Sequence, residues 1–262
     1  MSVAKVWIPA TRAVITGAGS GIGRAVAHAL AAKGAVVACV DLDGEAAKRV
    51  ADECGHGATG HQADVRDREQ LADLGLDDAG IVMANAGVGV SGRFTDMTAE
   101  DWNWIRSINL DGVVNTAAVW GPKLLEQGRG HLVITSSGLG FTPAVDLAAY
   151  CATKAAVLSL AASLRADWGQ HGVGVTAVCP GVINTPIIEA ARFVGEAGEH
   201  KEEARKLFGK GHSPNTVAKA VVRAIEHDRG IALAGWESKL AYGVHRFAPF
   251  AVQQKLAARG LS

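Results

Sequence analysis

The chain has 262 residues, of which 48% are hydrophobic and 20% charged, and its 26 basic residues balance its 26 acidic ones. This length allows a large buried core. The balanced charge argues against a nucleic-acid partner and against a disordered acidic tail, because both usually come with a strong charge excess. No stretch of about 18 residues is apolar and uncharged, so we expect no membrane span.

The start of the chain and its cysteines indicate a cytoplasmic protein. Residues 1–10 contain Lys5 but no apolar run before Arg12, which does not fit a cleavable signal. The four cysteines form neither a CxxC pair nor a metal-ligand spacing, so we expect no metal site. Cys39 and Cys179 lie in apolar strand-like runs and are expected to be buried thiols, which fits a reducing compartment.

Strand-like apolar runs alternate with segments of helical periodicity along the chain. Asn109 lies in the middle of the longest helical segment, where it either kinks the helix or occupies a neutral surface position. In chain order we predict a strand at 13–16, a helix at 21–33, a strand at 36–40, a helix at 43–54, a strand at 59–62, a helix at 67–74, a strand at 81–83, a helix at 99–127, a strand at 131–135, a helix at 150–170, a strand at 173–178, a helix at 213–228 and a strand at 231–234.

This alternation predicts an α/β fold, a doubly wound parallel sheet of about seven strands with helices on both faces. The sequence contains no linker, repeat or low-complexity segment, so we expect a single domain over residues 1–262. Within it, 181–212 is predicted to be a substrate flap with its own helical pieces. Residues 236–262 are predicted to form a C-terminal helical appendage, interrupted at Pro249.

A glycine-rich turn, Thr16-Gly17-Ala18-Gly19-Ser20-Gly21-Ile22-Gly23, joins the first predicted strand to the first helix. Glycines let the backbone turn sharply and approach a pyrophosphate, and the helix N-terminus offers free N–H groups and a positive dipole end. The spacing is G-x-x-x-G-x-G, and a lone turn of this kind is weak evidence. Its place directly after an apolar strand favours a dinucleotide site.

Asp41 ends the second strand about 20 residues beyond this loop, where an acid binds the adenosine ribose hydroxyls. A carboxylate there repels a 2′-phosphate, and the neighbours Val40, Leu42 and Asp43 include no arginine. We expect Arg24, in the first helix, to point away. These residues predict NAD rather than NADP as the cofactor. The alternative is that Asp41 merely caps the next helix.

Tyr150, with Lys154 four residues later and Ser137 thirteen residues earlier, suggests proton transfer. A phenol has an unperturbed pKa of about 10, and a cation one helical turn away would favour the phenolate and lower that value. The serine hydroxyl would hold a substrate oxygen beside it. Such a group suits an alcohol or a carbonyl substrate.

Two polar segments follow the third and fourth strands: Asp64-Val65 and Asn85-Ala86-Gly87. The carboxyl ends of parallel strands are the edge where open α/β sheets bind ligands. Each segment alone is equally consistent with an ordinary turn.

Taken in order, these motifs resemble the short-chain dehydrogenase/reductase (SDR) family, in the subgroup called classical, over residues 12–234. The resemblance implies a Rossmann-type fold and homo-oligomers, either homotetramers or homodimers, built through the long helices near 99–127 and 150–170. It rests on T-G-x-x-x-G-I-G at 16–23, Asn85-Ala86-Gly87, Asn109, Ser137, Tyr150-x-x-x-Lys154, and Pro180-Gly181 with Thr185.

The resemblance also implies roles for individual residues. Tyr150 would be the general acid/base, and Lys154 would lower its pKa and hold the nicotinamide ribose. Ser137 would bind the substrate oxygen, and Asn109 would hold a water that links Lys154 to solvent. The implied cofactor-binding residues are Gly17, Gly19, Ser20, Gly21, Ile22, Gly23, Asp41, Leu42, Asp64, Val65, Asn85, Ala86, Gly87, Tyr150, Lys154, Pro180, Gly181, Ile183 and Thr185.

The chain departs from the family pattern in three places. The segment from Asp64 to Asn85 is short, so we expect a truncated third helix. Ala84-Asn85 replaces the usual double asparagine and leaves one amide. Cys151 follows the tyrosine and is either a redox-sensitive thiol or, as we favour, a small helix residue.

A substrate is expected above the nicotinamide, between the loop before Tyr150 and the flap. Val88 and Val90 would add to its apolar walls. No arginine or lysine occurs near the substrate among the residues predicted to form these walls. This favours an apolar, steroid- or lipid-like alcohol or ketone. The alternative is that these residues are ordinary packing. The predicted walls are Leu139, Phe141, Val145, Val182, Ile187 and Phe193.

The C-terminal segment carries an apolar stripe of Trp236, Leu240, Val244 and Phe247 on one helix face. We expect this stripe to pack on the domain or on a second subunit. A lid over the pocket ranks second, and contact with a membrane surface a distant third. The surrounding basic residues are Lys239, His245, Arg246, Lys255 and Arg259.

The sequence therefore predicts an NAD-dependent oxidoreductase that acts on a small apolar secondary alcohol or its ketone. An NADPH-linked ketoacyl reductase is one alternative, and Asp41 argues against it. A catalytically silent NAD-binding sensor is another, and the complete set of Asn109, Ser137, Tyr150 and Lys154 argues against it.

Overall fold

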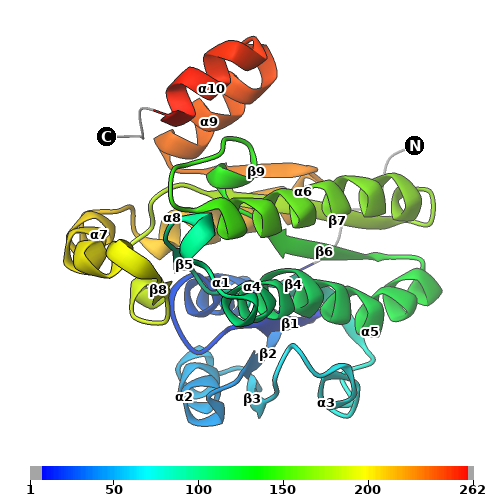
Figure 1. The fold of residues 1–262 in the computed structure, drawn as a ribbon. Helices are drawn as coiled ribbons and strands as arrows, with labels where there is room; N and C mark the ends of the chain where they lie inside the picture. The colour runs from blue at the N-terminus through cyan, green and yellow to red at the C-terminus, as the bar shows by residue number, and fades with distance from the viewer. Residues whose placement is uncertain (1–7, 259–262) are drawn as a thin grey trace.

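A computed structural model describes residues 8–258, and only the backbone of residues 257 and 258; Lys5 and Arg259 lie outside this range. A seven-stranded parallel sheet forms its centre, with the strand order β3-β2-β1-β4-β6-β7-β9 (Figure 1). Its strands are β1 (Arg12–Thr16), β2 (Val36–Asp41), β3 (Thr59–Gln62), β4 (Ala79–Ala84), β6 (Gly130–Thr135), β7 (Val173–Pro180) and β9 (Ile231–Ala234).

Helices cover both faces of this sheet, which confirms the predicted doubly wound architecture. Successive strand residues point to opposite faces, so Ala13 and Ile15 join one buried cluster and Val14 the other. Because both faces are covered, the inner strands are apolar throughout rather than alternating, whereas the edge strand β3 is polar and largely exposed. One layer contains α1 (Gly21–Ala31), α2 (Gly44–Cys54) and α8 (Pro214–Glu226), and the other contains α5 (Gly112–Gln127) and α6 (Ala148–Gly169).

The long helix predicted at 99–127 is interrupted. It is divided into α4 (Ala99–Arg106), a π-helical turn η2 (Ser107–Asp111) and α5, with Asn109 buried in the turn. The neutral surface position is therefore wrong for this asparagine, and the regular helix is interrupted where it lies. The helix α3 (Arg68–Ala72) has only five residues, which confirms the expected truncation.

A second, two-stranded sheet joins the segment after β4 to the predicted flap. Its strands β5 (Val90–Ser91) and β8 (Arg192–Phe193) run parallel. Two-residue strands are too short to show a hydrophobic period, so sequence reasoning missed them. The predicted flap also contains the 3₁₀ helices η4 (Pro186–Ile188) and η5 (Gly195–His200) and the helix α7 (Lys201–Gly209).

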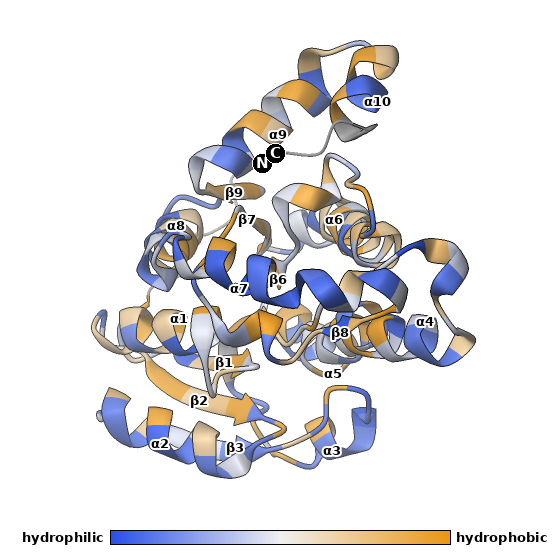
Figure 2. Ribbon diagram, turned by 60° about the vertical axis from the view of Figure 1, so that its left-hand side comes forward, coloured by the Kyte–Doolittle hydropathy of each residue, from blue (hydrophilic) through white to orange (hydrophobic). Residues whose placement is uncertain are grey.

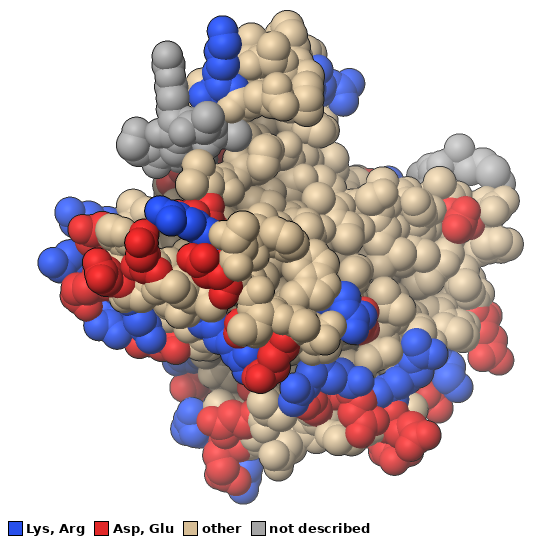
Figure 3. All heavy atoms as spheres, viewed as in Figure 1, with Lys and Arg blue, Asp and Glu red and all other residues tan. Residues whose placement is uncertain are grey.

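The C-terminal segment forms α9 (Trp236–Phe247) and α10 (Phe250–Ala258), separated at Pro249 as expected. Figure 2 shows apolar residues on this projecting pair, and Figure 3 shows a largely uncharged surface with a few basic side chains there. Among residues 8–258, no helix combines the length and apolar content that a membrane span requires.

The predicted packing of the apolar stripe on the domain is wrong. Trp236, Leu240 and Phe247 are 63%, 50% and 80% exposed, whereas Ser238 and Ala241 are the buried positions of α9. Small side chains on this face let the helix approach the core closely, and the large apolar residues point outward.

Candidate active site

The glycine-rich turn has the geometry that a pyrophosphate requires. Gly17 and Gly21 adopt φ values of 65° and 52°, in the left-handed region that favours glycine. A Cβ atom on Gly17 would lie 2.8 Å from the Cα of Ala86, and one on Gly23 would collide with the carbonyl oxygen of Gly17. The loop is therefore closed to side chains and keeps its backbone accessible.

The N-terminus of α1 has an anion-binding character. Within the described part of the chain, Ser20 makes no side-chain cap hydrogen bond, and the first turn of α1 has no acidic residue. The first N–H groups and the positive end of the helix dipole are thus left for an anion. The residues of this turn fit the diphosphate of a dinucleotide.

Asp41 binds the glycine loop rather than capping a helix. Its Oδ2 accepts a hydrogen bond from the N–H of Gly19 at 2.8 Å, and its Oδ1 accepts one from the N–H of Asp43 at 3.1 Å. Asp43 is the N-cap of α2, where it accepts from the N–H of Ala46. The capping alternative for Asp41 is therefore wrong.

The arginines near the adenosine end of the site are both engaged by carboxylates. Arg24 pairs with Glu53 at 2.9 Å, so it points away as expected. Arg66, which sequence reasoning did not weigh, binds both oxygens of Asp64 and holds the pKa of that carboxyl below its ordinary value.

Two predicted cofactor contacts have side chains placed away from a shared pocket. Val65 is buried against Gly112 of α5, so it can offer only its backbone. Leu42 is 61% exposed in the turn after β2.

Asn85 ties three segments together at the point where the strand order reverses. Its amide nitrogen donates to the carbonyl oxygens of Thr16 and Gly17, each at 3.1 Å. Its Oδ1 accepts from the hydroxyl of Thr135 at 3.2 Å. One amide thus links the carboxyl ends of β1 and β6 to the glycine loop, at the crevice where doubly wound sheets bind ligands.

Ser137, Tyr150 and Lys154 come together as the sequence predicts. Ser137 follows β6, and its hydroxyl is near enough to the phenol of Tyr150 to favour the ionised form of that phenol. Lys154 is buried on α6, where its Nζ donates to the carbonyl oxygen of Thr135 at 3.0 Å. The same Nζ lies 5.7 Å from the centre of the Tyr150 ring.

Burial is the largest influence on the pKa values of Tyr150 and Lys154. It raises the pKa of Tyr150 to about 12, and the hydroxyl of Ser137 opposes that shift. It lowers the pKa of Lys154 to about 8. Both shifts disfavour the charged form, as expected for groups withdrawn from water. In this structure the pKa of Tyr150 is thus raised rather than lowered, contrary to our expectation from Lys154 alone.

Asn109 meets Lys154 across Gly87. The Asn109 Oδ1 accepts from the N–H of Val88 at 2.8 Å, and its amide nitrogen donates to the Val88 carbonyl at 2.9 Å. A Cβ on Gly87 would lie 3.2 Å from Asn109 Oδ1 and 3.4 Å from Lys154 Nζ. The π-helical turn aims this amide inward, consistent with the frequent occurrence of such turns at functional sites.

The start of the flap lies against the glycine loop. Pro180 ends β7, and the N–H of Gly181 donates to the carbonyl of Ala234 at 2.7 Å. A Cβ on Gly21 would lie 3.1 Å from the Thr185 side chain. Ile183 is buried in the core, so its side chain does not face the crevice.

The predicted substrate walls are only partly brought together. Leu139, Val182, Ile187 and Phe193 are half-buried, and Val145 is exposed.

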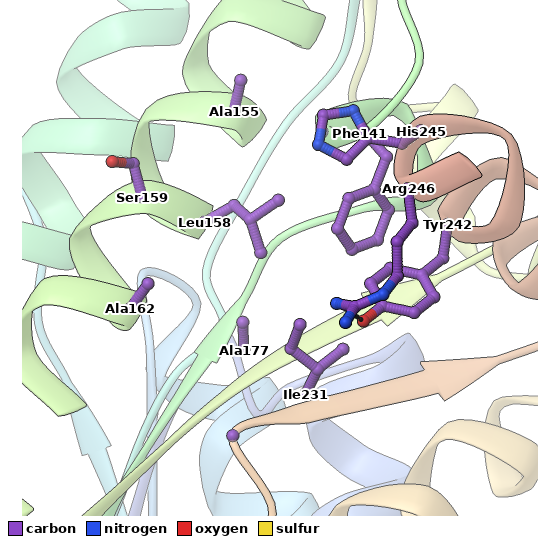
Figure 4. A pocket seen from close by; sticks show the side chains of 12 residues that line it. Phe141, Ala155, Leu158, Ser159, Ala162, Ala177, Ile231, Tyr242, His245 and Arg246 are labelled. Atoms are coloured by element: carbon purple, nitrogen blue, oxygen red, sulfur yellow. Dashed lines mark hydrogen bonds between the residues drawn. The ribbon is translucent and has the colours of Figure 1, made fainter. Parts of the chain in front are cut away.

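Phe141 is not a wall of the site. Its ring packs edge-on against Tyr242, with centroids 5.2 Å apart, and at a tilt against His245, with centroids 5.7 Å apart (Figure 4). These three rings line a groove of about 510 Å³ between α6, β9 and α9. Phe141 follows η3 (Gly138–Gly140), and this turn directs its ring to α9.

An apolar cluster that sequence reasoning mostly missed does contact Tyr150. It combines residues from β5, α4, α6 and the flap, and β5–β8 pairing is what brings the flap residue Val194 to it. Only Val88 and Val90 were expected near a substrate. The cluster comprises Val88, Val90, Met97, Trp102, Trp104, Ile105, Ala149, Tyr150 and Val194.

Comparison with known proteins identifies relatives of this chain. Residues 11–193 match the family model for short chain dehydrogenases. The "Probable oxidoreductase EphD" of Mycobacterium tuberculosis is 37% identical over 258 residues, covering 91% of this chain and 43% of that protein. The chain thus spans less than half the length of this curated relative.

Solved structures are similar over nearly the whole chain. A short chain dehydrogenase/reductase from Burkholderia phymatum, in complex with NAD, is 27% identical with a TM-score of 0.87, covering 95% of this chain and 96% of that one. A short-chain dehydrogenase from Sphingobium yanoikuyae, in complex with NADPH, is 25% identical with a TM-score of 0.77, covering 94% and 96%.

Proposed function

Since the chain belongs to the short-chain dehydrogenase family of oxidoreductases, we propose that it transfers hydride between a secondary alcohol, or the corresponding ketone, and NAD. The observation that carries this proposal is the meeting of Ser137, Tyr150 and Lys154 at the sheet edge that also bears the glycine loop. A proton-transfer group beside a dinucleotide cradle suits alcohol oxidation and carbonyl reduction.

In the oxidative direction, the phenolate of Tyr150 takes the proton of the substrate hydroxyl. Ser137 orients the substrate oxygen by hydrogen bonding. When bound, the dinucleotide supplies the acceptor for the hydride. The pKa of Tyr150 is about 12 by burial, so a cation is needed beside it, and Lys154, with a pKa of about 8, is charged at neutral pH. Asn109 would hold the water through which the proton leaves.

The preference for NAD rests on Asp41. Its carboxylate lies at the end of β2 and is held by the N–H groups of Gly19 and Asp43. An anion at this place repels a 2′-phosphate. Arg24 and Arg66 are paired with other carboxylates, so neither offsets that charge.

The proposed substrate is apolar and steroid- or lipid-like. This is supported by the apolar cluster that includes Tyr150, to which Val88 and the flap residue Val194 also belong. Arg192, in β8 of the flap, stacks on Trp104 of this cluster, and its charge is paired with Asp101 at 3.0 Å. We further propose that 181–212 acts as the substrate flap of a single catalytic domain, in a cytoplasmic homotetramer or homodimer.

The test is the reduction of NAD and of NADP at mildly alkaline pH, with a panel from short secondary alcohols to hydroxysteroids. We expect NAD-linked turnover that rises with substrate apolarity, and a preference over NADP of about a hundredfold, corresponding to about 2.7 kcal/mol. Asp41→Ala should narrow that preference, and Asp52→Ala, which removes an acid on the solvent side of α2, should leave it unchanged. Dinucleotide binding without turnover of any member of the panel would refute the proposal. So would NADPH-linked reduction of ketoacyl thioesters, measured separately, with no turnover of the alcohols.

A further inference from the structure

The first two turns of α9 pack behind both loops of the catalytic site. The hydroxyl of Ser238 donates to the carbonyl of Cys179 at 2.5 Å, and a Cβ on Gly138 would lie 3.3 Å from the Ser238 Cα. The Thr142 hydroxyl donates to the carbonyl of Ala241 at 3.4 Å. This helix therefore supports the turn that follows Ser137 and the end of β7.

Glu237 lies against the backbone where the flap begins. Its Oε2 is only 2.6 Å from the place where a Cβ on Gly181 would sit, and 2.7 Å from the equivalent place on Gly235. Two glycines thus make room for one carboxylate. The side chain of Glu237 is 19% exposed, so its charge needs a partner.

That partner is His212, at the far end of the flap. The Nε2 of His212 lies 3.1 Å from Glu237 Oε2. Its backbone N–H donates to the carbonyl of Val182 and its carbonyl accepts from the N–H of Asn184, each at 2.9 Å. His212 is thus bound to residues 181–185 through its backbone and to α9 through its side chain.

These contacts join Gly181, His212 and Glu237 to one another. The chain leaves β7 at Gly181, pairs with His212, and is held from behind by Glu237, which itself contacts Gly181. Each of the two side chains has the other as its hydrogen-bond partner. The pair is placed to hold the flap base rather than to react.

We propose that Glu237 and His212 are positioning residues that fix residues 181–185 for the nicotinamide half of the dinucleotide. This inference rests on the proposed function, because only a bound dinucleotide gives that loop its role. It predicts that loss of the pair weakens contacts to the nicotinamide half and leaves the adenosine half, held near Asp41, unchanged.

Two ligands distinguish the contributions of the nicotinamide and adenosine halves to binding. Reduced NAD contains both, whereas ADP-ribose lacks the nicotinamide ring. Glu237→Ala should weaken binding of reduced NAD by about tenfold or more, and change binding of ADP-ribose by less than about twofold. His212→Ala should do the same, and the double variant should lose little beyond either single change.

The matched control is Glu226→Ala, at the end of α8, which breaks an ion pair with Lys33 at 2.8 Å. It should bind both ligands as the wild type does. Glu237→Ala leaves a space beside two glycines, so Glu237→Gln is measured in parallel. Glutamine keeps the side-chain size and removes the charge. It should also weaken binding of reduced NAD and not of ADP-ribose, but by a smaller factor.

The positioning role would be overturned if binding of reduced NAD and of ADP-ribose weakened equally. It would also be overturned if both Glu237 variants bound reduced NAD as the wild type does. A wild-type protein that binds neither ligand would instead overturn the proposed function on which it rests.

Discussion

The buried imidazole of His131 should make the free energy of unfolding depend on pH between 7.5 and 5. His131 is fully buried in β6, and its Nε2 lies 2.7 Å from the hydroxyl of Thr176. That hydroxyl already donates to the carbonyl of Arg229, so it accepts from His131. The imidazole is therefore neutral with its proton on Nε2, and Nδ1 has no hydrogen-bond partner within the described residues.

The size of the effect follows from the pKa. Burial lowers the pKa of His131 to about 4, from a reference value of 6.5. The unfolded chain therefore binds more protons than the folded one over this interval. The stabilisation is fully present above pH 6.5 and is lost as the pH falls toward 4. Integrating the difference gives a loss of about 2 kcal/mol between pH 7.5 and pH 5.

Urea unfolding at several pH values, with the wild type and His131→Gln, measures this quantity. The variant should be less stable at pH 7.5, because it loses the fit to Thr176, but its stability should fall by about 2 kcal/mol less on going to pH 5. Carboxylates with lowered pKa values, such as Asp64 and Asp101, contribute equally to both proteins and cancel. Parallel pH profiles for the two proteins would refute the reasoning.

Two further substitutions test the glycine-rich turn and the packing of the domain. Gly23→Ala places a Cβ against the carbonyl of Gly17, so binding of reduced NAD, followed by fluorescence, should weaken by at least about tenfold. The control is Gly169→Ala, where a Cβ would meet nothing within 4 Å and binding should be normal. Equal losses of binding in the two variants would contradict the role of the turn. Arg165→Ala removes the two-pronged pairing with Asp228, at 2.8 and 2.9 Å, and should lower the free energy of unfolding by about 2 kcal/mol, since the pair is largely shielded from solvent; an unchanged urea midpoint would contradict this.

Most of the sheet could be predicted from sequence because its strands are apolar runs, and the inner ones are buried on both faces. A continuous apolar run such as Ile231–Ala234 marks a strand whatever its neighbours are, and the predicted and observed bounds agree there. The two-residue strands β5 and β8 carry no such pattern. They form only because distant segments meet, so the cluster that brings Val194 to Tyr150 was missed.

The sequence predicted which residues meet at the catalytic group, but not the direction of the surrounding side chains or the pKa of Tyr150. The spacing of Tyr150 and Lys154 puts both on one helix face, and the strand edge brings Ser137 to them. Side-chain direction was not available from spacing, as Phe141 and the outward stripe at Trp236 show. The pKa of Tyr150 depends on the depth of burial, which sequence does not give.

The role of Tyr150 as the general acid/base is tested by comparing Tyr150→Phe with the wild type on the best alcohol of the panel. Turnover and binding of reduced NAD are measured on the same preparations. We expect turnover to fall by about a thousandfold or more, because the proton acceptor is gone, and binding of reduced NAD to change by less than about threefold. Turnover comparable to that of the wild type would contradict the assignment of Tyr150 as the general acid/base.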